Sequence, residues 1–527
     1  MTKGAVALVL HAHLPYVRST QPGSLEEDWF FQALIECYLP LLGVLEHNDD
    51  DAATAPKITI GLSPTLLSLL DDDELKKRFP NWLEARLQLL PEAEPSLRHA
   101  AVHLAWTIER HRQSWLDCNG DLIGRFARLQ QRGVVDLLTC GATHGYLPLL
   151  RQNPEAIRGQ LRTAVREHQR LIGERPLGIW LPECAYYEGL DRWMRDAGLR
   201  YAVLDGHGLL HAHPRPRYGV YAPICSRNGV AFFGRDSDAT LPVWSAKDGY
   251  PGDPQYREFH RDLGWDLPLE KLEPLGLKEP RPLGLKLHRV TDHTLSLDQK
   301  QPYAPDIAAE RIRQHAQHYL RGRRQQLEQL AATMQINPLL VAPFDAELFG
   351  HWWFEGPAFL NELFKQGPTE GIQFTRLRDV LQTAGQLQLC DPCPSSWGQG
   401  GFHNYWLNET NAWVVSEWDR AGEAMVRRCS RGVGREQDLD LLRQAARELL
   451  LAQSSDWSFI LRAGTTTDLA RNRIKRHLER FWLLMAAIDD NESLPHGWLE
   501  EVQMDDRLFP LIQPLDWAMV HRETMQR

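Results

Sequence analysis

Short apolar runs, most of them followed at once by polar or acidic residues, recur along the first 350 positions of the chain. The runs occupy residues 4–10, 57–62, 134–139, 176–182, 201–204 and 337–344. Longer stretches with apolar residues at helical spacing separate several of them. This order predicts a parallel α/β domain of the barrel type, in which the carboxyl ends of the strands meet at one mouth.

One long stretch, residues 206–305, interrupts this pattern because it is rich in Pro and Gly. So long an irregular insertion in a compact domain predicts a functional rim or lid. Strand-like pieces at 230–233 and 284–287 are embedded in it, and helical sequence resumes at 306–334.

The last part of the chain is strongly helical between residues 410 and 490. A chain of 527 residues also exceeds what one hydrophobic core usually fills. We therefore expect a catalytic domain over 1–390 and a helical domain over 391–527 that contributes to the active-site cleft.

Composition narrows the classes of partner. The formal net charge of −10 argues against a nucleic-acid surface, and no run reaches the roughly 18 consecutive apolar residues that span a bilayer. We therefore expect a neutral or small polar substrate, no nucleic acid and no membrane. Eight cysteines without framework spacing indicate reduced thiols in a cytoplasmic protein, and Cys390 and Cys393 are read as part of a plain loop rather than a zinc site.

Two carboxylates stand at the ends of separate predicted strands. Glu183 follows the run at 176–182, and Asp345 follows the run at 337–344. Glycoside cleavage needs two carboxyl groups that flank the bond to be broken. This pair is the main candidate for the chemistry.

Histidines also collect at strand ends. His11 and His13 alternate along an extended chain and can face one cavity, and His144 follows another predicted strand. A metal site with these three ligands is one interpretation. The other, which we favour, is that the imidazoles form hydrogen bonds with substrate hydroxyls.

A glycine-rich loop at 395–406 carries several aromatic residues, in a chain with 18 tryptophans. Aromatic faces pack well against the apolar faces of sugar rings. We therefore expect this loop to form a platform for sugars.

Five motifs, in a fixed order along the chain, make the sequence resemble a known family. They are HAHLPY (11–16), GATHGYLP (141–148), WLPECAY (180–186), PFDAELFGHWW (343–353) and SWGQGGFHNYW (396–406). Together they resemble the motifs of glycoside hydrolase family 57, and most of all its 1,4-α-glucan branching enzymes. The resemblance covers nearly the whole chain and implies an incomplete (β/α)7 TIM-like barrel with an inserted subdomain and a C-terminal α-helical domain.

The resemblance also implies roles for individual residues. Glu183 would be the nucleophile and Asp345 the general acid/base of a retaining reaction, without cofactor or metal. Arg261 would assist the nucleophile, and α-1,4-glucan would be both donor and acceptor. The expected substrate contacts are His11, His13, Trp29, His144, Trp265, Trp353, Trp397, Trp406 and Asp456.

Branching members of the family are expected to close a loop tipped by a tyrosine over the site, but no tyrosine lies between Tyr221 and Tyr250. Hydrolysis of the α-amylase type and 4-α-glucanotransferase activity therefore stay open as alternatives. A metal-dependent hydrolase built on the three histidines and a non-catalytic glucan-binding protein are further ones.

Overall fold

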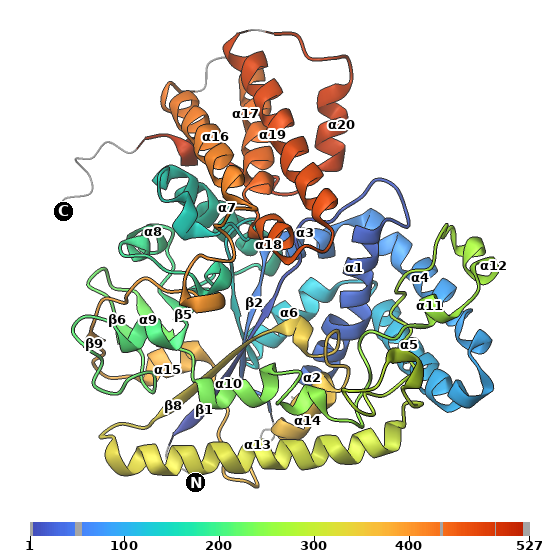
Figure 1. Ribbon diagram of the computed structural model, residues 1–527. Coiled ribbons are helices and arrows are strands. Elements are labelled where there is room, and N and C mark those ends of the chain that lie inside the picture. Colours follow the sequence, from blue (N-terminus) through green and yellow to red (C-terminus); the bar gives the residue numbers. More distant parts are fainter. Residues whose placement is uncertain (1–3, 48–54, 433–435, 491, 520–527) are drawn as a thin grey trace.

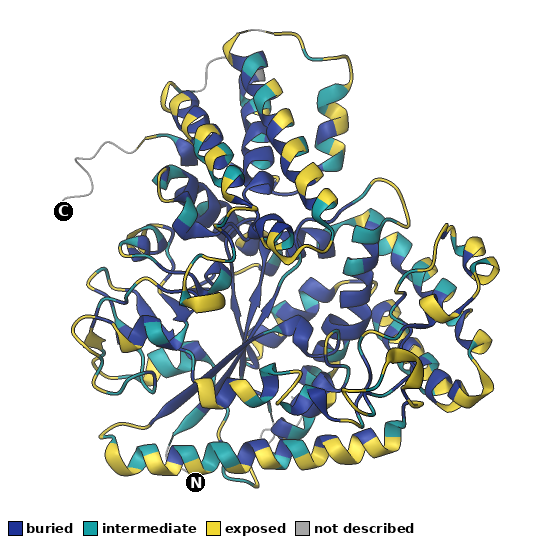
Figure 2. Ribbon diagram, in the orientation of Figure 1, coloured by how far each residue is buried: buried dark blue, intermediate teal, exposed yellow. Residues whose placement is uncertain are grey.

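The computed structural model describes residues 4–47, 55–432, 436–490 and 492–519. It places a bundle of helices from the last part of the chain on top of an α/β barrel, with one long helix, α13, running along the opposite end (Figure 1). The strands at the centre are almost entirely buried, whereas α13 exposes much of its surface (Figure 2).

Seven parallel strands form the barrel. They are β1 (Ala5–Ala12), β2 (Ile58–Leu62), β3 (Val135–Leu138), β4 (Gly178–Ile179), β5 (Tyr201–Leu204), β7 (Ala231–Gly234) and β8 (Leu339–Asp345). Their hydrogen-bonded order is β8-β1-β2-β3 and β4-β5-β7, and a parallel bridge between Thr139 and Ile179 joins the two groups. Between β7 and β8 the described residues form no ladder, but the amide of Asp236 donates to the carbonyl of Val341 at 2.9 Å. The predicted incomplete barrel is confirmed.

The stretch predicted to be irregular contains one of these strands. β7 is four residues long and wholly buried, so it contributes to the barrel itself, and the short β6 (Ile224–Cys225) pairs with it and with β9 (Gln388–Leu389). The strand expected at 284–287 is wrong. The amide of Gly284 donates to the carboxylate of Asp262 at 2.9 Å instead of joining a ladder.

Helices flank the barrel and the inserted segment, and most of them bury apolar residues against their neighbours. In chain order they are α1 (Leu25–Ala33), α2 (Leu39–His47), α3 (Pro64–Asp71), α4 (Asp73–Leu87), α5 (Arg98–Asp117), α6 (Leu122–Gln131), α7 (Pro154–Ile172), α8 (Leu190–Asp196), α9 (Gly206–Leu210), α10 (Ser237–Trp244), α11 (Leu263–Asp266), α12 (Leu269–Leu272), α13 (Pro305–Thr333), α14 (Gly356–Gln366) and α15 (Leu377–Thr383).

A π-helical turn, Leu34–Tyr38, joins α1 to α2. Its side chains reach the segment that follows β8: Cys37 Sγ donates to the carbonyl of Ala346 at 3.1 Å, and Tyr38 OH donates to Glu347 Oε1 at 2.6 Å. The whole helical run over residues 25–47 is long and apolar enough to cross a membrane, but 78% of its most apolar window is buried inside the protein. The burial gives this run the character of a core helix.

The C-terminal bundle consists of α16 (Ala412–Ser430), α17 (Glu436–Ala452), α18 (Ser455–Ala463), α19 (Thr467–Asp489) and α20 (Trp498–Asp505). One of its connections to the barrel lies where α17 ends and α18 begins. There the amide of Ser455 donates to the carbonyl of His144 at 3.2 Å, and the Thr143 hydroxyl donates to the carbonyl of Leu450. The first turn of α18 is therefore fixed at the barrel mouth.

Candidate active site

Glu183 lies in a tight turn directly after β4. It and Cys184 both have left-handed backbone conformations, with φ of 60° and 50°. Non-glycine residues in this region cost about 1–3 kcal/mol each and persist where the surroundings over-determine them. Here Trp397 fixes the turn from both sides: its amide donates to the carbonyl of Glu183 at 3.0 Å, and its indole N–H donates to Glu183 Oε2 at 2.8 Å.

Asp345 is the last residue of β8, in register with His11 on β1. Burial raises the pKa of Asp345 to about 8, and the neighbouring carboxylate of Glu347 acts in the same direction. His13 and Arg235 oppose the increase. A carboxyl group in this environment holds its proton near neutral pH.

The two carboxyl groups interact with each other. Burial raises the pKa of Glu183 to about 8 as well, against the Trp397 hydrogen bond, and the charge of Asp345 raises it further. Both carboxyls therefore hold their protons to higher pH than ordinary carboxyls do. Because the Trp397 N–H donates directly to Glu183, we assign the first negative charge to Glu183 and the retained proton to Asp345.

The three predicted histidines meet beside this pair. His11 Nε2 and His144 Nε2 are 3.1 Å apart, and the rings of His13 and His144 stack with centroids 3.9 Å apart. His11 also stacks on Trp180, with centroids 4.7 Å apart. A Cβ at Gly61 would lie 3.0 Å from His11 Nδ1, so a glycine in β2 makes room for this ring.

The C-terminal bundle completes the histidine cluster. Asp456, in the first turn of α18, accepts from His13 Nε2 at 3.1 Å, and the Ser455 hydroxyl is 2.8 Å from His144 Nδ1. Burial by itself would raise the pKa of Asp456, but its contacts with His13, His144 and the Ser454 hydroxyl lower it. Asp456 is therefore a fixed negative charge at the mouth.

These groups also include a possible metal-ligand set, because ligand atoms of His13, His144 and Asp456 lie within 4.8 Å of one another. Each of these three side chains already has a hydrogen-bond partner: Asp456 accepts from His13, and the Ser455 hydroxyl contacts His144 Nδ1. His13 Nδ1 is likewise 2.9 Å from the Ser63 hydroxyl. The donor set fits a hydrogen-bonded cluster better than a chelate.

Two further residues belong to the site and were not predicted for it. Glu347 accepts from Tyr38 OH and from the amide of His13, at 2.6 and 3.0 Å, and burial raises its pKa to about 7. Arg235, directly after β7, pairs with Asp205 at 3.5 Å and lowers the pKa of Asp345. Arg235 could have been predicted from its position at a strand end. It was missed because β7 lies in the stretch that the sequence predicts to be irregular.

The predicted tryptophans divide into different environments. Trp397 contacts the nucleophile candidate and packs edge-on against Trp180. Trp353 is only 1% exposed and packs against Tyr256 and Phe359, and Trp406 is 2% exposed and stacks on Tyr146. Both are core residues in this structure and offer no face to a sugar, which corrects the prediction for these two.

The remaining predicted contacts lie on α1 and the inserted segment. Trp29 is partly buried in α1, and Trp265 in α11 is 54% exposed. Arg261 pairs with Asp266 at 3.3 Å and donates to the carbonyl of Leu297 at 2.9 Å, both within the insertion. The described contacts of Arg261 therefore place it in the insertion's own framework rather than on Glu183.

Comparison with known proteins shows the same architecture. The sequence profile described as glycosyl hydrolase family 57 matches residues 7–390, and the profile of the C-terminal region of 1,4-alpha-glucan branching enzymes matches residues 417–517. Among curated proteins, the 1,4-alpha-glucan branching enzyme TK1436 of Thermococcus kodakarensis is 32% identical over 513 residues, which span 91% of this chain and 73% of that protein.

Solved structures of similar proteins cover almost the whole chain. The alpha-amylase AmyC of Thermotoga maritima has a TM-score of 0.91 and 33% identity, over 98% of this chain and all of that one. The GH57-type branching enzyme of Pyrococcus horikoshii has a TM-score of 0.89 and 30% identity, over 98% of this chain and 97% of that one.

Proposed function

Because the chain belongs to glycoside hydrolase family 57, we propose that it is a retaining α-glucan transglycosylase that cleaves α-1,4 linkages and forms α-1,6 branches. The observation that carries this proposal is the buried pair of Glu183 and Asp345, both with raised pKa values, with the indole N–H of Trp397 bound to Glu183. The branching assignment is supported by the similarity to branching enzymes over nearly the full length and by the C-terminal match. The substrate, as donor and as acceptor, is an α-1,4-glucan polymer.

In the first step, Glu183 attacks the anomeric carbon while Asp345 protonates the departing glycosidic oxygen. The bond between the anomeric carbon and that oxygen breaks, and a glucosyl ester with Glu183 forms. The proton on Asp345 is available because burial raises its pKa to about 8.

In the second step, Asp345 acts as base. It removes the proton from a C6 hydroxyl of an acceptor chain, and the resulting oxygen displaces Glu183 from the sugar. The histidine cluster fixed by Asp456 and Ser455 presents polar edges to the donor sugar beside the two carboxyls. Water competes with the acceptor in this step, so a bound acceptor chain that excludes water determines how much branching occurs.

A second candidate is a mainly hydrolytic enzyme of the α-amylase type. It is favoured by the likeness to AmyC and by the absence of a tyrosine between Tyr221 and Tyr250. Much of that stretch forms β6, β7 and α10 in the structure, so the barrel wall occupies a large part of the place where the tyrosine-tipped loop was expected. The acceptor would then be water.

Incubation with amylose decides between these two, if α-1,6 linkages and new reducing ends are counted together. Branches in excess of reducing ends are expected, and reducing ends without branches would refute the branching assignment. The Glu183→Gln protein is the control for contaminating activity. Activity that disappears with a chelator would instead favour the metal-dependent alternative.

We also propose a cytoplasmic location and a role in the synthesis of a storage glucan such as glycogen. The location is supported by the eight cysteines, all of which are free thiols. Fractionation of the source cells with an antibody to this protein would test it.

A further inference from the structure

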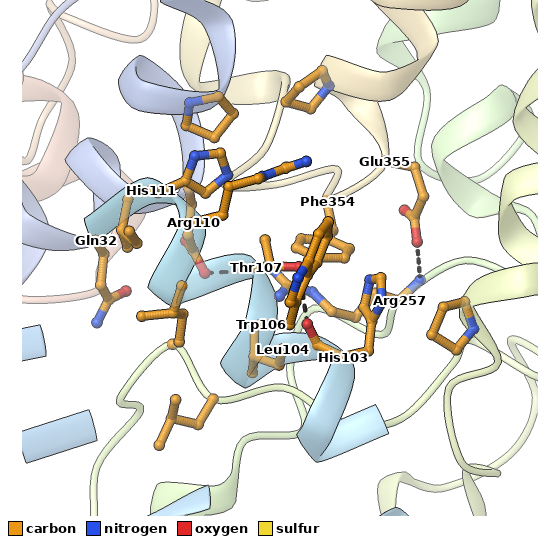
Figure 3. Close-up of a pocket in the computed structure, with 18 of the residues that line it drawn as sticks. Gln32, His103, Leu104, Trp106, Thr107, Arg110, His111, Arg257, Phe354 and Glu355 are labelled. Carbon is orange, nitrogen blue, oxygen red and sulfur yellow. Dashed lines mark hydrogen bonds and ion pairs between the residues drawn. The ribbon is translucent and has the colours of Figure 1, made fainter. Parts of the chain in front are cut away.

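A cavity of about 270 Å³ lies between the outer helices, away from the catalytic pair. α1, α4, α5 and α13 contribute to its wall, together with the inserted segment and the loop after β8 (Figure 3). Neither Glu183, Asp345 nor any of the three clustered histidines lines it. The cavity is therefore separate from the site described above.

The cavity wall is largely aromatic and apolar. Trp106, on α5, is 59% exposed and lies at the rim, and the Arg110 guanidinium is 4.8 Å from the centre of its ring. Deeper in the wall, the Arg257 guanidinium lies 3.8 Å from the centre of the Phe354 ring, in the arrangement visible in Figure 3. Flat aromatic and guanidinium surfaces of this kind suit the apolar faces of sugar rings.

Two buried donors on this wall lack a partner. Arg86 Nε and Arg257 Nη1 form no hydrogen bond within the described part of the chain, although the two residues are only 6% and 7% exposed. The guanidinium groups of this wall therefore keep hydrogen-bonding capacity that the protein itself does not use.

The charges of the cavity favour a neutral ligand. Arg86 is already paired with Asp28 at 2.8 Å and Arg257 with Glu36 at 3.3 Å. Glu355, a second buried acid on the same wall, would repel an anion. A ligand with hydroxyl groups can both donate to the carboxylates and accept from the guanidinium groups.

The two histidines of the wall, His103 and His111, are also consistent with a neutral ligand. Burial lowers the pKa of His103, and burial lowers the pKa of His111 to about 3. Neutral imidazoles each offer one donor and one acceptor, which again matches hydroxyl groups rather than ions.

We propose that this cavity is a second, non-catalytic glucan-binding site that takes the end of a chain, one or two glucosyl units long. The proposal rests on the proposed function, because it takes its ligand class from the α-glucan substrate. A glucan chain held here would keep the polymer near the enzyme while another part of it reacts, which raises the effective concentration of substrate at the catalytic site.

The test is the binding of maltose to the full-length Glu183→Gln protein, followed by isothermal titration calorimetry. Ala309, on α13, is exposed and lines the cavity, so Ala309→Trp narrows it without removing a buried group. Ile307, on the same helix, is 54% exposed and is not part of the wall, so Ile307→Trp is the matched control.

We expect the Glu183→Gln parent and its Ile307→Trp variant to bind at least two maltose molecules per chain, and the Ala309→Trp variant to bind one fewer. Equal stoichiometry in all three proteins would refute the cavity site and leave the proposed function untouched. A parent that binds only one maltose refutes it too. Failure of the proposed function shows separately, as a wild-type protein that neither branches nor cleaves amylose.

Discussion

The hydrogen bond from the Trp397 indole to Glu183 permits the sharpest prediction. It is 2.8 Å long and ends on a carboxyl group that burial holds at a pKa of about 8. Trp397→Phe removes this donor but leaves the backbone amide, which donates to the carbonyl of Glu183 at 3.0 Å. The turn should therefore persist while the anionic form of Glu183 loses its main stabilising contact.

The expected size follows from the strength of such bonds. Hydrogen bonds to charged groups contribute about 1.5–3 kcal/mol, and about 1.4 kcal/mol corresponds to one pKa unit. The pKa of Glu183 should thus rise by about one to two units. Since only ionised Glu183 can attack, kcat/KM at pH 7 should fall about 10- to 100-fold, and the acidic limb of the pH profile should move to higher pH.

The assay is the pH dependence of kcat/KM on amylose for the wild-type protein, Trp397→Phe and Trp180→Phe. Trp180 touches Trp397 edge-on, is fully buried, and its indole N–H has no hydrogen-bond partner within the described chain. Trp180→Phe therefore removes the same atoms without removing a bond to Glu183. An acidic limb that stays in place in Trp397→Phe, or that moves equally in both variants, would refute the reasoning.

Three further predictions address other parts of the site. Glu183→Gln should lower turnover on the order of 10⁴-fold or more while calorimetry still detects maltose binding; a modest loss would mean that another group is the nucleophile. Glu347→Gln removes a charge that raises the pKa of Asp345, so the basic limb of the kcat/KM profile should move to lower pH by about one pH unit. A shift of this limb to higher pH would contradict the prediction. The pKa of Asp456 is lower in the folded protein than in the unfolded chain, where it is about 4, so its contact with His13 should stabilise the fold above about pH 4 and less as the pH falls below that value. In urea unfolding at pH 3–6, Asp456→Asn should therefore weaken the rise of the unfolding free energy with pH. An unchanged rise would exclude this contribution of Asp456.

Much of the barrel could be read from the sequence because its strands are short apolar runs with polar ends. The same rule placed Glu183, Asp345 and the histidines at one mouth, where the structure brings them together. For β7, by contrast, the sequence predicts only a strand-like piece within an irregular insertion and not a strand of the barrel. Its four buried residues stand among prolines and glycines, and no local signal distinguishes a barrel strand from a strand in a loop.

Side-chain environments were harder to predict than elements. The family resemblance assigns a tryptophan by its place in a motif and does not show whether its ring faces a sugar or the core, which is why Trp353 and Trp406 were predicted as substrate contacts although both are buried. The contacts of Glu347 with Tyr38 and His13 join positions about 310 and 334 residues apart. Pairings at such distances depend on the packing of whole helices, and residue order alone carries no trace of them.

In the π-helical turn between α1 and α2, the number of residues matters as well as their types. A π turn contains one residue more than the α-helical turn it replaces. The extra residue in Leu34–Tyr38 is therefore absorbed within this one turn, and α1 and α2 keep the orientation of one continuous helix. Deleting it would close the turn to an ordinary α-helical one and leave α1 and α2 in place. The loss would fall on the contacts that the turn itself makes, those of Cys37 with Ala346 and of Tyr38 with Glu347. Related sequences that keep these contacts should therefore keep the number of residues in this turn.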